Sequence, residues 1–308
     1  MRSVTESIFT IIFSVEFTTG NLGNGFIILV SCMDTINRRK ISVADHLLTA
    51  LAISRIVLLW IILTGWWIHV FYPGFLINVV IIRIFYVIWT VGFHFNAWLA
   101  TCLSIFYCLK IANFSNSIFL YFKWRVKKVV SLILLVCLVL LFLHLLQSNI
   151  HVNVLIDGYK RRMSYNSSLY ITPEFPKLLL FSSIVFTFIA FALSLTMFLL
   201  LVFSLWKHLK RMQHSVIGSR DVSTTAHTKA LQAVVVFLLL YTTFFLSIFI
   251  QLWRPEFLPF IFYHIVEIAF PSVHSFVLVL GSTKLKQASL SLLRSLRCGS
   301  KDAESSGS

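Results

Sequence analysis

The sequence predicts an all-α integral membrane protein, a bundle of seven transmembrane helices with its N-terminus outside and its C-terminus in the cytoplasm. Three observations predict this fold. The 308 residues are 58% hydrophobic and only 12% charged, about half the charged share of a typical soluble domain. Seven separate runs are long and apolar enough to cross a bilayer. Lys and Arg gather in alternate gaps between those runs, which sets the orientation.

Hydropathy and net charge also limit which kinds of fold and binding partner are expected. A mean hydropathy of +0.88 excludes a water-soluble fold, because a soluble domain of this length cannot bury so much apolar surface. A net charge of +15 would suggest nucleic acid in a soluble protein. Here the basic residues lie in short segments between apolar runs, so we expect contact with anionic lipid or an acidic cytoplasmic partner, and no nucleic acid. No Gly/Ser-rich or charge-rich block divides the chain, which we treat as one domain over residues 1–308.

The seven spans follow from the length that a helix needs to cross the hydrocarbon layer, about 20 mostly apolar residues. The windows are residues 7–32, 46–68, 79–109, 129–146, 178–205, 230–253 and 258–280, with a cytoplasmic tail at 281–308. The runs are continuous rather than alternating, which excludes a β-barrel. The first run lacks the basic start and the cleavage site of a signal peptide, so we interpret it as a signal anchor.

The orientation rests on the basic residues. Eighteen of the 26 Lys and Arg residues follow spans one, three, five and seven, and the positive-inside rule places those segments in the cytoplasm. The basic cluster at 160–162 lies in a longer loop and therefore weighs less. Asn166 begins a glycosylation triplet in that outer loop, whereas Asn113 begins one on the cytoplasmic side, where it should stay unmodified. No cysteine lies in an outer loop, and Cys298 in the tail is either a free thiol or a palmitoylation site.

Polar residues in spans one, two and seven predict a buried cluster in the inner half of the membrane. Arg55 lies nine residues into span two, and Asn24 and His274 lie at similar depth in spans one and seven. A charged side chain at mid-bilayer costs roughly 2.5–3.5 kcal/mol, so Arg55 needs buried partners. The cluster is either static glue between helices or a network that rearranges on activation.

Spans three and seven carry a second polar set in the outer half, among aromatic residues. Aromatic walls with a few polar groups suit a small-molecule cavity. The predicted ligand-binding residues are Trp89, Phe93, His94, Asn96, His264 and Glu267. Glu267 could instead pair with Arg83, or be neutral because burial disfavours a charged carboxylate. Further along, Pro271 predicts a kink in span seven, and residues 284–297 predict a basic amphipathic helix on the inner membrane face.

Five groups of short motifs occur in order at matching span positions. They are LGNGFI at 22–27, LAISR at 51–55, LSIFYCLKIANFS at 103–115, SLWKH at 204–208, and PSVHSF at 271–276 followed by KLKQ at 284–287. Through these motifs the chain resembles the bitter taste receptors, the type 2 taste receptors among G-protein-coupled receptors, along nearly its whole length. Span three ends in Phe106, Tyr107 and Cys108 rather than an Asp-Arg-Tyr triplet, and span seven lacks Asn-Pro-x-x-Tyr. Both departures from rhodopsin-like receptors fit this family.

The resemblance implies a plasma-membrane receptor that binds small bitter compounds and activates a gustducin-type G protein. It implies that spans three and seven line the ligand cavity, with His264 facing the ligand. The family often has an Asn one turn after the Trp of span three, whereas this chain has Phe93, so a more aromatic pocket is expected. We expect the activation network to comprise Asn24, Arg55, Tyr107 and His274, and the G-protein-facing residues to be Lys110, Lys207, His208 and Lys229.

Three other classes of protein are alternatives to this family. A vomeronasal type 1 pheromone receptor is the close rival, and agonist chemistry would separate the two. A small-solute transporter or channel would need repeated halves and several midplane charges, which the sequence lacks. An enzyme is not expected, because no paired acids, metal-spaced His/Cys cluster or nucleophile–base pair is recognisable, and no metal or cofactor is expected either.

Overall fold

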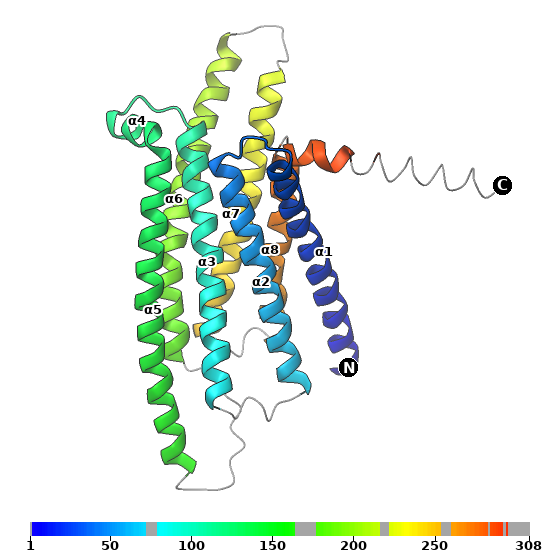
Figure 1. The fold of residues 1–308 in the computed structure, drawn as a ribbon, viewed down its shortest axis with the longest axis vertical. Helices are drawn as coiled ribbons and strands as arrows, with labels where there is room; N and C mark the ends of the chain where they lie inside the picture. Colours follow the sequence, from blue (N-terminus) through cyan, green and yellow to red (C-terminus); the bar gives the residue numbers. More distant parts are fainter. Residues whose placement is uncertain are drawn as a thin grey trace, which may run out of the picture.

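The computed structural model describes residues 2–71, 79–163, 177–215, 222–253, 260–282, 284–291 and 294. Within these ranges the chain forms helices joined by short turns and contains no strand. The helices, drawn in Figure 1, are α1 (Arg2–Ile36), α2 (Val43–Phe71), α3 (Val79–Ile111), α4 (Ser117–Trp124), α5 (Val126–Met163), α6 (Lys177–Ser215), α7 (Val222–Trp253) and α8 (Phe260–Gly281).

Seven of these helices contain the seven predicted apolar windows, apart from residues 258 and 259, which lie outside the described residues. The helices run past the windows. The largest extension is in α5, which ends at Met163 rather than at residue 146. A helix satisfies its own backbone hydrogen bonds and can therefore continue beyond the apolar run. Where each helix leaves the membrane stays a prediction.

Four helices of the described chain qualify as membrane spans on length and hydropathy alone, over Val43–Ile68, Arg83–Ile111, Val126–Ile150 and Ile184–Lys207. A shorter apolar stretch lies in α7 at Val235–Ile250. After α8 the chain turns by 92° into a short helix, Lys284–Ser291. This helix runs sideways from the end of the bundle beside α1 in Figure 1, in the segment where the tail helix was predicted. It carries no label there and is drawn in red-orange.

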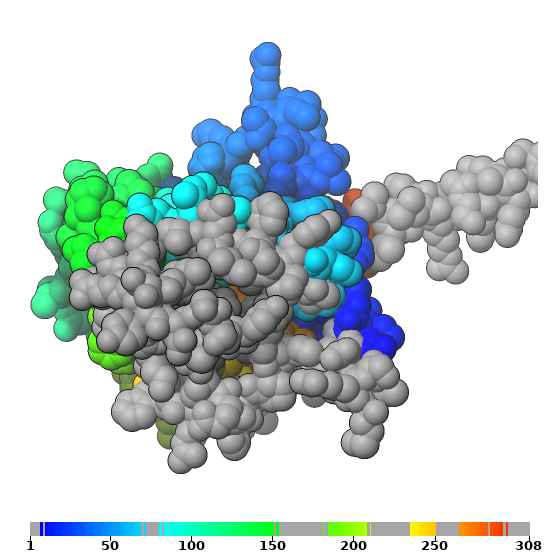
Figure 2. All heavy atoms as spheres, turned by 90° about the horizontal axis from the view of Figure 1, so that it is seen from below, coloured from blue at the N-terminus to red at the C-terminus, as the bar shows by residue number. Residues whose placement is uncertain are grey.

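The helices close into a ring, with α3 in the most enclosed position. Going round, α1 packs against α2, α2 against α3, α3 against α5 and α6, α6 against α7, α7 against α8, and α8 against α1. Viewed along the bundle in Figure 2, α5 in green and α1 in dark blue lie on opposite sides. Within their apolar windows, 83% of α3 is buried, compared with 22% of α5. Most of α5 therefore faces outward, toward lipid.

Glycines let α1 and α8 approach closely. A Cβ added at Gly20 would collide with the Ser272 hydroxyl of α8 and lie 2.9 Å from a methyl of Leu59 of α2. A Cβ added at Gly23 would collide with the hydroxyl of Ser275. The Ser272 hydroxyl also donates to the backbone carbonyl of Glu16, at 2.9 Å. The missing side chains of these two glycines therefore set the spacing of the two helices.

The short helix α4 was not predicted from the sequence. Asn116 caps its start, because its side-chain oxygen accepts a hydrogen bond from the backbone N–H of Ile118 at 2.8 Å. None of its residues is buried. At its far end the Lys123 ammonium donates to the carbonyl of Ala112, at 2.9 Å, which fastens α4 to the turn after α3.

An ion-pair group joins the segment after α8 to the first two helices. The Lys284 ammonium lies 2.6 Å from the Asp34 carboxylate of α1 and 2.8 Å from the Asp45 carboxylate of α2. Partial burial lowers the pKa of Lys284, but the hydrogen bonds to these two carboxylates outweigh it and leave the pKa above its usual value. Arg39 lies 3.4 Å from Asp34. Asp34 and Asp45 therefore both have basic partners.

Candidate functional site

The outer part of the predicted ligand site is assembled from α3 and α8. Trp89 of α3 donates its indole N–H to the carboxylate of Glu267 of α8, at 3.2 Å. Glu267 is only 2% exposed, although it carries an ionisable group. One turn further along α3, the ring of Phe93 stacks on Trp89 with centroids 5.2 Å apart. Three of the predicted ligand-binding residues thus form one aromatic wall with a single buried carboxyl group.

Arg83, the other candidate partner of Glu267, donates a hydrogen bond to Asn153 of α5.

Aromatic rings continue from this wall toward the other end of the bundle. Phe93 contacts Phe244 of α7 with centroids 5.5 Å apart, and Phe244 stacks on Phe270 of α8 at 5.2 Å. Phe270 in turn lies 5.8 Å from the ring of His274. Packed rings have few alternative arrangements. The chain from Trp89 to His274 therefore gives the outer wall a direct physical connection to the predicted polar cluster.

Arg55 lies at the centre of that polar cluster. Its side chain is fully buried, and it donates to Asn96 of α3 at 3.4 Å and to the ring nitrogen of His274 of α8. Its guanidinium also lies over the face of Phe270, 5.9 Å from the centroid, an arrangement that stabilises a cation. Asn24 of α1, equally buried, reaches the cluster by donating to the backbone carbonyl of Pro271 at 3.4 Å.

Asn96 and Tyr107 lie elsewhere on α3 than their predicted groups. Asn96 was assigned to the ligand cavity, but its side-chain oxygen points to Arg55, so the structure groups it with the polar cluster. Tyr107 was assigned to that cluster, but it lies eleven residues beyond Asn96 on α3, about 16 Å along the helix. Its ring contacts Phe106, near the other end of α3.

His94 lies on the side of α3 that faces α5. Its ring N–H donates to the backbone carbonyl of Cys137 at 3.0 Å, and its ring lies beside Trp98 and His144. The structure therefore places His94 in the contact between α3 and α5 rather than beside Trp89.

Several predicted residues are only partly described or not described. His264 lies on α8, but its side chain is outside the described residues, and so are the side chains of His208 on α6 and Lys229 on α7. Asn166, the predicted glycosylation site, lies outside them altogether.

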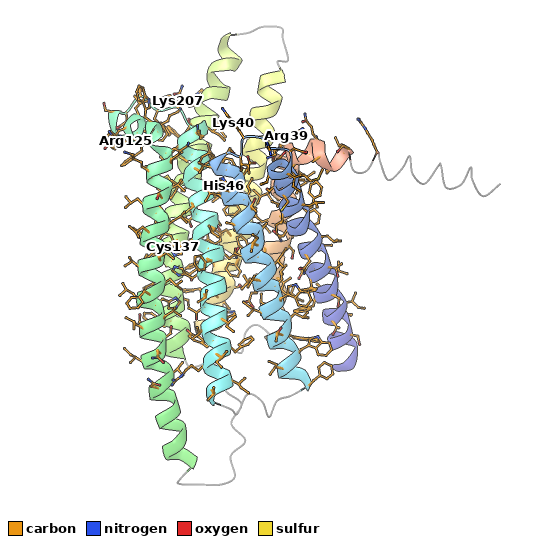
Figure 3. The ribbon with its side chains drawn as sticks, in the orientation of Figure 1. Arg39, Lys40, His46, Arg125, Cys137 and Lys207 are labelled. Carbon is orange, nitrogen blue, oxygen red and sulfur yellow. The ribbon has the colours of Figure 1, made fainter. Side chains whose placement is uncertain are left out.

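Basic side chains gather at one end of the bundle. Figure 3 places Arg39, Lys40, Arg125 and Lys207 at that end and Cys137 near mid-height. In Figure 1 this is the end opposite the N-terminus. Lys110 at the end of α3 and Lys207 on α6 are both exposed, as a surface that contacts an acidic partner requires.

Sequence reasoning missed the two rings that connect the sites. Phe244 and Phe270 are buried, at 3% and 2% exposure, but they are two of 30 phenylalanines, and nothing local distinguishes them. Among the described residues, no group of three or more His, Cys, Asp and Glu side chains could hold a metal ion.

Comparison with known proteins gives one consistent result. The sequence model of the family described as "Taste receptor protein (TAS2R)" matches residues 1–297. Taste receptor type 2 member 14 of Macaca mulatta is 52% identical over 311 residues, which cover 100% of this chain and 98% of the relative. The Homo sapiens protein of the same name is 52% identical over 310 residues with the same coverage. Taste receptor type 2 member 140 of Rattus norvegicus is 50% identical over 308 residues and covers 99% of each chain.

Proposed function

Because the chain belongs to the TAS2R family of taste receptors, we propose that small bitter compounds bind beside Trp89 and Glu267 and thereby activate a gustducin-type G protein. Members of this family are seven-helix G-protein-coupled receptors of the plasma membrane, so the chain is a bitter taste receptor and not an enzyme. This membership decides against the pheromone-receptor and transporter alternatives.

The observation that carries the ligand site is the hydrogen bond from Trp89 to buried Glu267 beside the stacked ring of Phe93. Aromatic faces bind flat apolar compounds through buried contact area and ring stacking. The carboxyl group adds one strong acceptor, which can bind an amine or hydroxyl of the ligand. The site therefore suits compounds with an apolar ring system and a hydrogen-bond donor.

We infer that the ring chain from Phe93 through Phe244 and Phe270 couples this site to the cluster around Arg55. A ligand shifts a receptor between two states only if it binds one of them better. A compound that changes the packing of Phe93 also changes the support of Phe270, which stabilises the guanidinium of Arg55. The coupling acts through contacts that are already formed.

We place the N-terminus outside the cell and the basic end of the bundle in the cytoplasm. The positive-inside rule supports this, since the basic side chains gather at the end opposite the N-terminus (Figures 1 and 3). In this orientation four basic residues, one at the end of α3, two on α6 and one on α7, form the surface for the G protein. They are Lys110, Lys207, His208 and Lys229.

The test of the ligand site is a calcium assay in cells that express the receptor with a gustducin-chimaera G protein, challenged with a panel of bitter compounds. Trp89→Phe removes the indole N–H and keeps an aromatic ring. The indole N–H holds the Glu267 carboxyl in position for the ligand, so a variant without it should bind ligand more weakly and its EC50 should rise. Trp89→Ala should raise it further. Trp60→Phe is the matched control, because Trp60 is 54% exposed.

Unchanged dose–response curves for both Trp89 variants, at equal surface expression, would remove this residue from the ligand site. The choice of G protein is tested separately. Chimaeras that carry the gustducin C-terminus should respond more strongly than those that carry unrelated C-termini, and equal responses would refute gustducin selectivity.

A further inference from the structure

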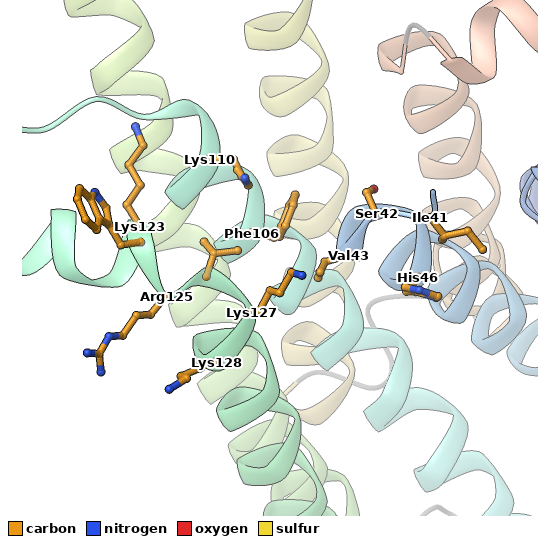
Figure 4. A pocket seen from close by; sticks show the side chains of 12 residues that line it. Ile41, Ser42, Val43, His46, Phe106, Lys110, Lys123, Arg125, Lys127 and Lys128 are labelled. Carbon is orange, nitrogen blue, oxygen red and sulfur yellow. The ribbon is translucent and has the colours of Figure 1, made fainter. Parts of the chain in front are cut away.

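A basic pocket lies at the inner end of the bundle, far from the proposed ligand site. It has a volume of about 680 Å³ and is enclosed by the start of α2, the end of α3 and the junction of α4 with α5 (Figure 4). Its lining includes six basic side chains, His46, Lys110, Lys123, Arg125, Lys127 and Lys128, and no Asp or Glu among the described residues that line it. In Figure 4, Lys127 extends toward the start of α2.

The positive charge of this pocket is not balanced locally. Lys123 donates to a backbone carbonyl, and Arg125 donates to the hydroxyl of Tyr121 at 2.9 Å, so the hydrogen-bond partner of each is neutral. Asp45, which precedes His46 on α2, accepts a hydrogen bond from Ser42 in the pocket wall at 2.8 Å. The other oxygen of Asp45 is bound by Lys284. In the described chain the pocket therefore presents several cations to an occupant with negative charge.

The position of the pocket relative to the membrane indicates which kind of molecule can occupy it. Helix α4 forms one edge, and it exposes large apolar side chains although no residue of it is buried. Ile118 is 67% exposed, and Trp124, which itself lines the pocket, is 88% exposed. A helix of this composition lies in the membrane interface, with its apolar side chains among the lipid tails and Trp at head-group level. The mouth of the pocket is therefore where phospholipid head groups are.

We propose that this pocket binds the phosphorylated head group of a multiply charged anionic lipid, of the phosphatidylinositol bisphosphate class, from the inner leaflet. Lysine ammonium groups bind phosphate as point charges, and basic pockets between transmembrane helices bind such head groups. Helix α5 begins at Val126 in the pocket wall, so the positive end of its dipole adds to the attraction. A lipid fits better than a protein partner, because no residue of α6, α7 or α8 lines the pocket in the described chain, whereas three of the four proposed G-protein contacts lie on α6 and α7.

The test is native mass spectrometry of the full-length receptor in detergent, titrated with phosphatidylinositol 4,5-bisphosphate, with phosphatidylserine and with soluble inositol trisphosphate. The pocket variant is Lys127→Gln with Lys128→Gln, which leaves Lys110 intact for the G protein. The matched control is Lys40→Gln with Lys286→Gln, which removes two exposed charges at the same end of the bundle. A basic residue near an anionic surface contributes about fivefold in affinity.

The bisphosphate lipid should bind the unmodified receptor most tightly. The pocket variant should lose about 25-fold in affinity for it, and the control should stay within about twofold. Replacing the same two lysines by arginine should keep the affinity, which separates a charge effect from damage to the fold. Lipid binding is measured without agonist or G protein, so the result does not depend on the proposed ligand site or G protein. Only the assignment of the pocket to the inner leaflet rests on the proposed function.

Three outcomes would overturn the proposal. Equal affinity in the pocket variant and the unmodified receptor would remove the two lysines from the site. Equal binding of soluble inositol trisphosphate would show a site for free phosphate compounds rather than for lipid. An equal loss in the pocket variant and in the control would show diffuse attraction over the whole basic end.

Discussion

Replacing Gly20 by alanine tests how closely α1 and α8 must approach. The new Cβ would collide with the Ser272 hydroxyl, and would lie 2.9 Å from a methyl of Leu59 and 3.1 Å from the Ser272 Cβ. The hydroxyl can turn away only by giving up its hydrogen bond to the Glu16 carbonyl. Leu59 is fully buried, so its methyl has no free space to enter. The added carbon therefore has to move one of the helices.

The size of the effect follows from two opposed terms. Overpacking a well-packed interior costs about 1–3 kcal/mol, whereas replacing glycine by alanine within a helix gains about 1 kcal/mol. Gly25 lies on the same helix, and a Cβ added there meets nothing within 4 Å. Gly25→Ala should therefore only stabilise the helix, by the same gain of about 1 kcal/mol. The two variants should differ by about 1–3 kcal/mol, or about 2–6 °C in melting temperature for a chain of this size.

The melting temperature can be measured with the receptor's own buried cysteines. Cys102, Cys108 and Cys137 are free thiols buried between helices, so a thiol-reactive dye reports their exposure as the purified receptor unfolds in detergent. Gly20→Ala should melt below Gly25→Ala. If Gly20→Ala melts at the same temperature or higher, the close approach of α1 and α8 is not a constraint, and the reasoning from the glycines is wrong.

Three further predictions concern the polar cluster, the tail and the topology. Arg55→Ala leaves buried acceptors without a donor and opens a cavity, at a cost of about 3 kcal/mol or more; normal surface expression and melting temperature would refute the buried cluster. Lys284→Gln should speed hydrogen exchange over residues 284–291, and Lys286→Gln should not. Because the pKa of Lys284 is raised on folding, its stabilisation is complete below pH 10.5 and is lost as the pH rises through the higher folded value. Asn166→Gln should shift the receptor to the mobility of enzymatically deglycosylated protein; unchanged mobility would contradict an outer position for that loop.

The positions of the long helices could be predicted from apolar runs alone, because burying that much hydrocarbon leaves few alternatives. Their ends could not. Residues 147–163 are too polar to count as a span, yet α5 continues through them to Met163. Helix α4 was missed for a related reason, since its eight residues are too few for a span and its cap, Asn116, is a weak local signal.

The sequence predicts which residues belong to the candidate site more readily than it predicts which of them contact one another. Trp89 and Glu267 were both identified and are joined by a hydrogen bond. Asn96 was predicted to bind the ligand, and the structure shows its side-chain oxygen accepting a hydrogen bond from Arg55. A single sequence gives the depth of a residue in its own helix, but not the rotation and axial shift of one helix against another. Those depend on packing between residues far apart in the chain, such as Phe244 and Phe270.

The unequal enclosure of α3 and α5 has a consequence for how this receptor can change over generations. With 83% of its apolar window buried, α3 offers few positions where one side chain can replace another without disturbing a neighbour, whereas α5, at 22%, meets mostly lipid. Inherited variants that leave the receptor working should therefore accumulate on α5, where one aliphatic residue serves as well as another. A change of ligand preference through α3 should need a second, compensating substitution on the helix it touches.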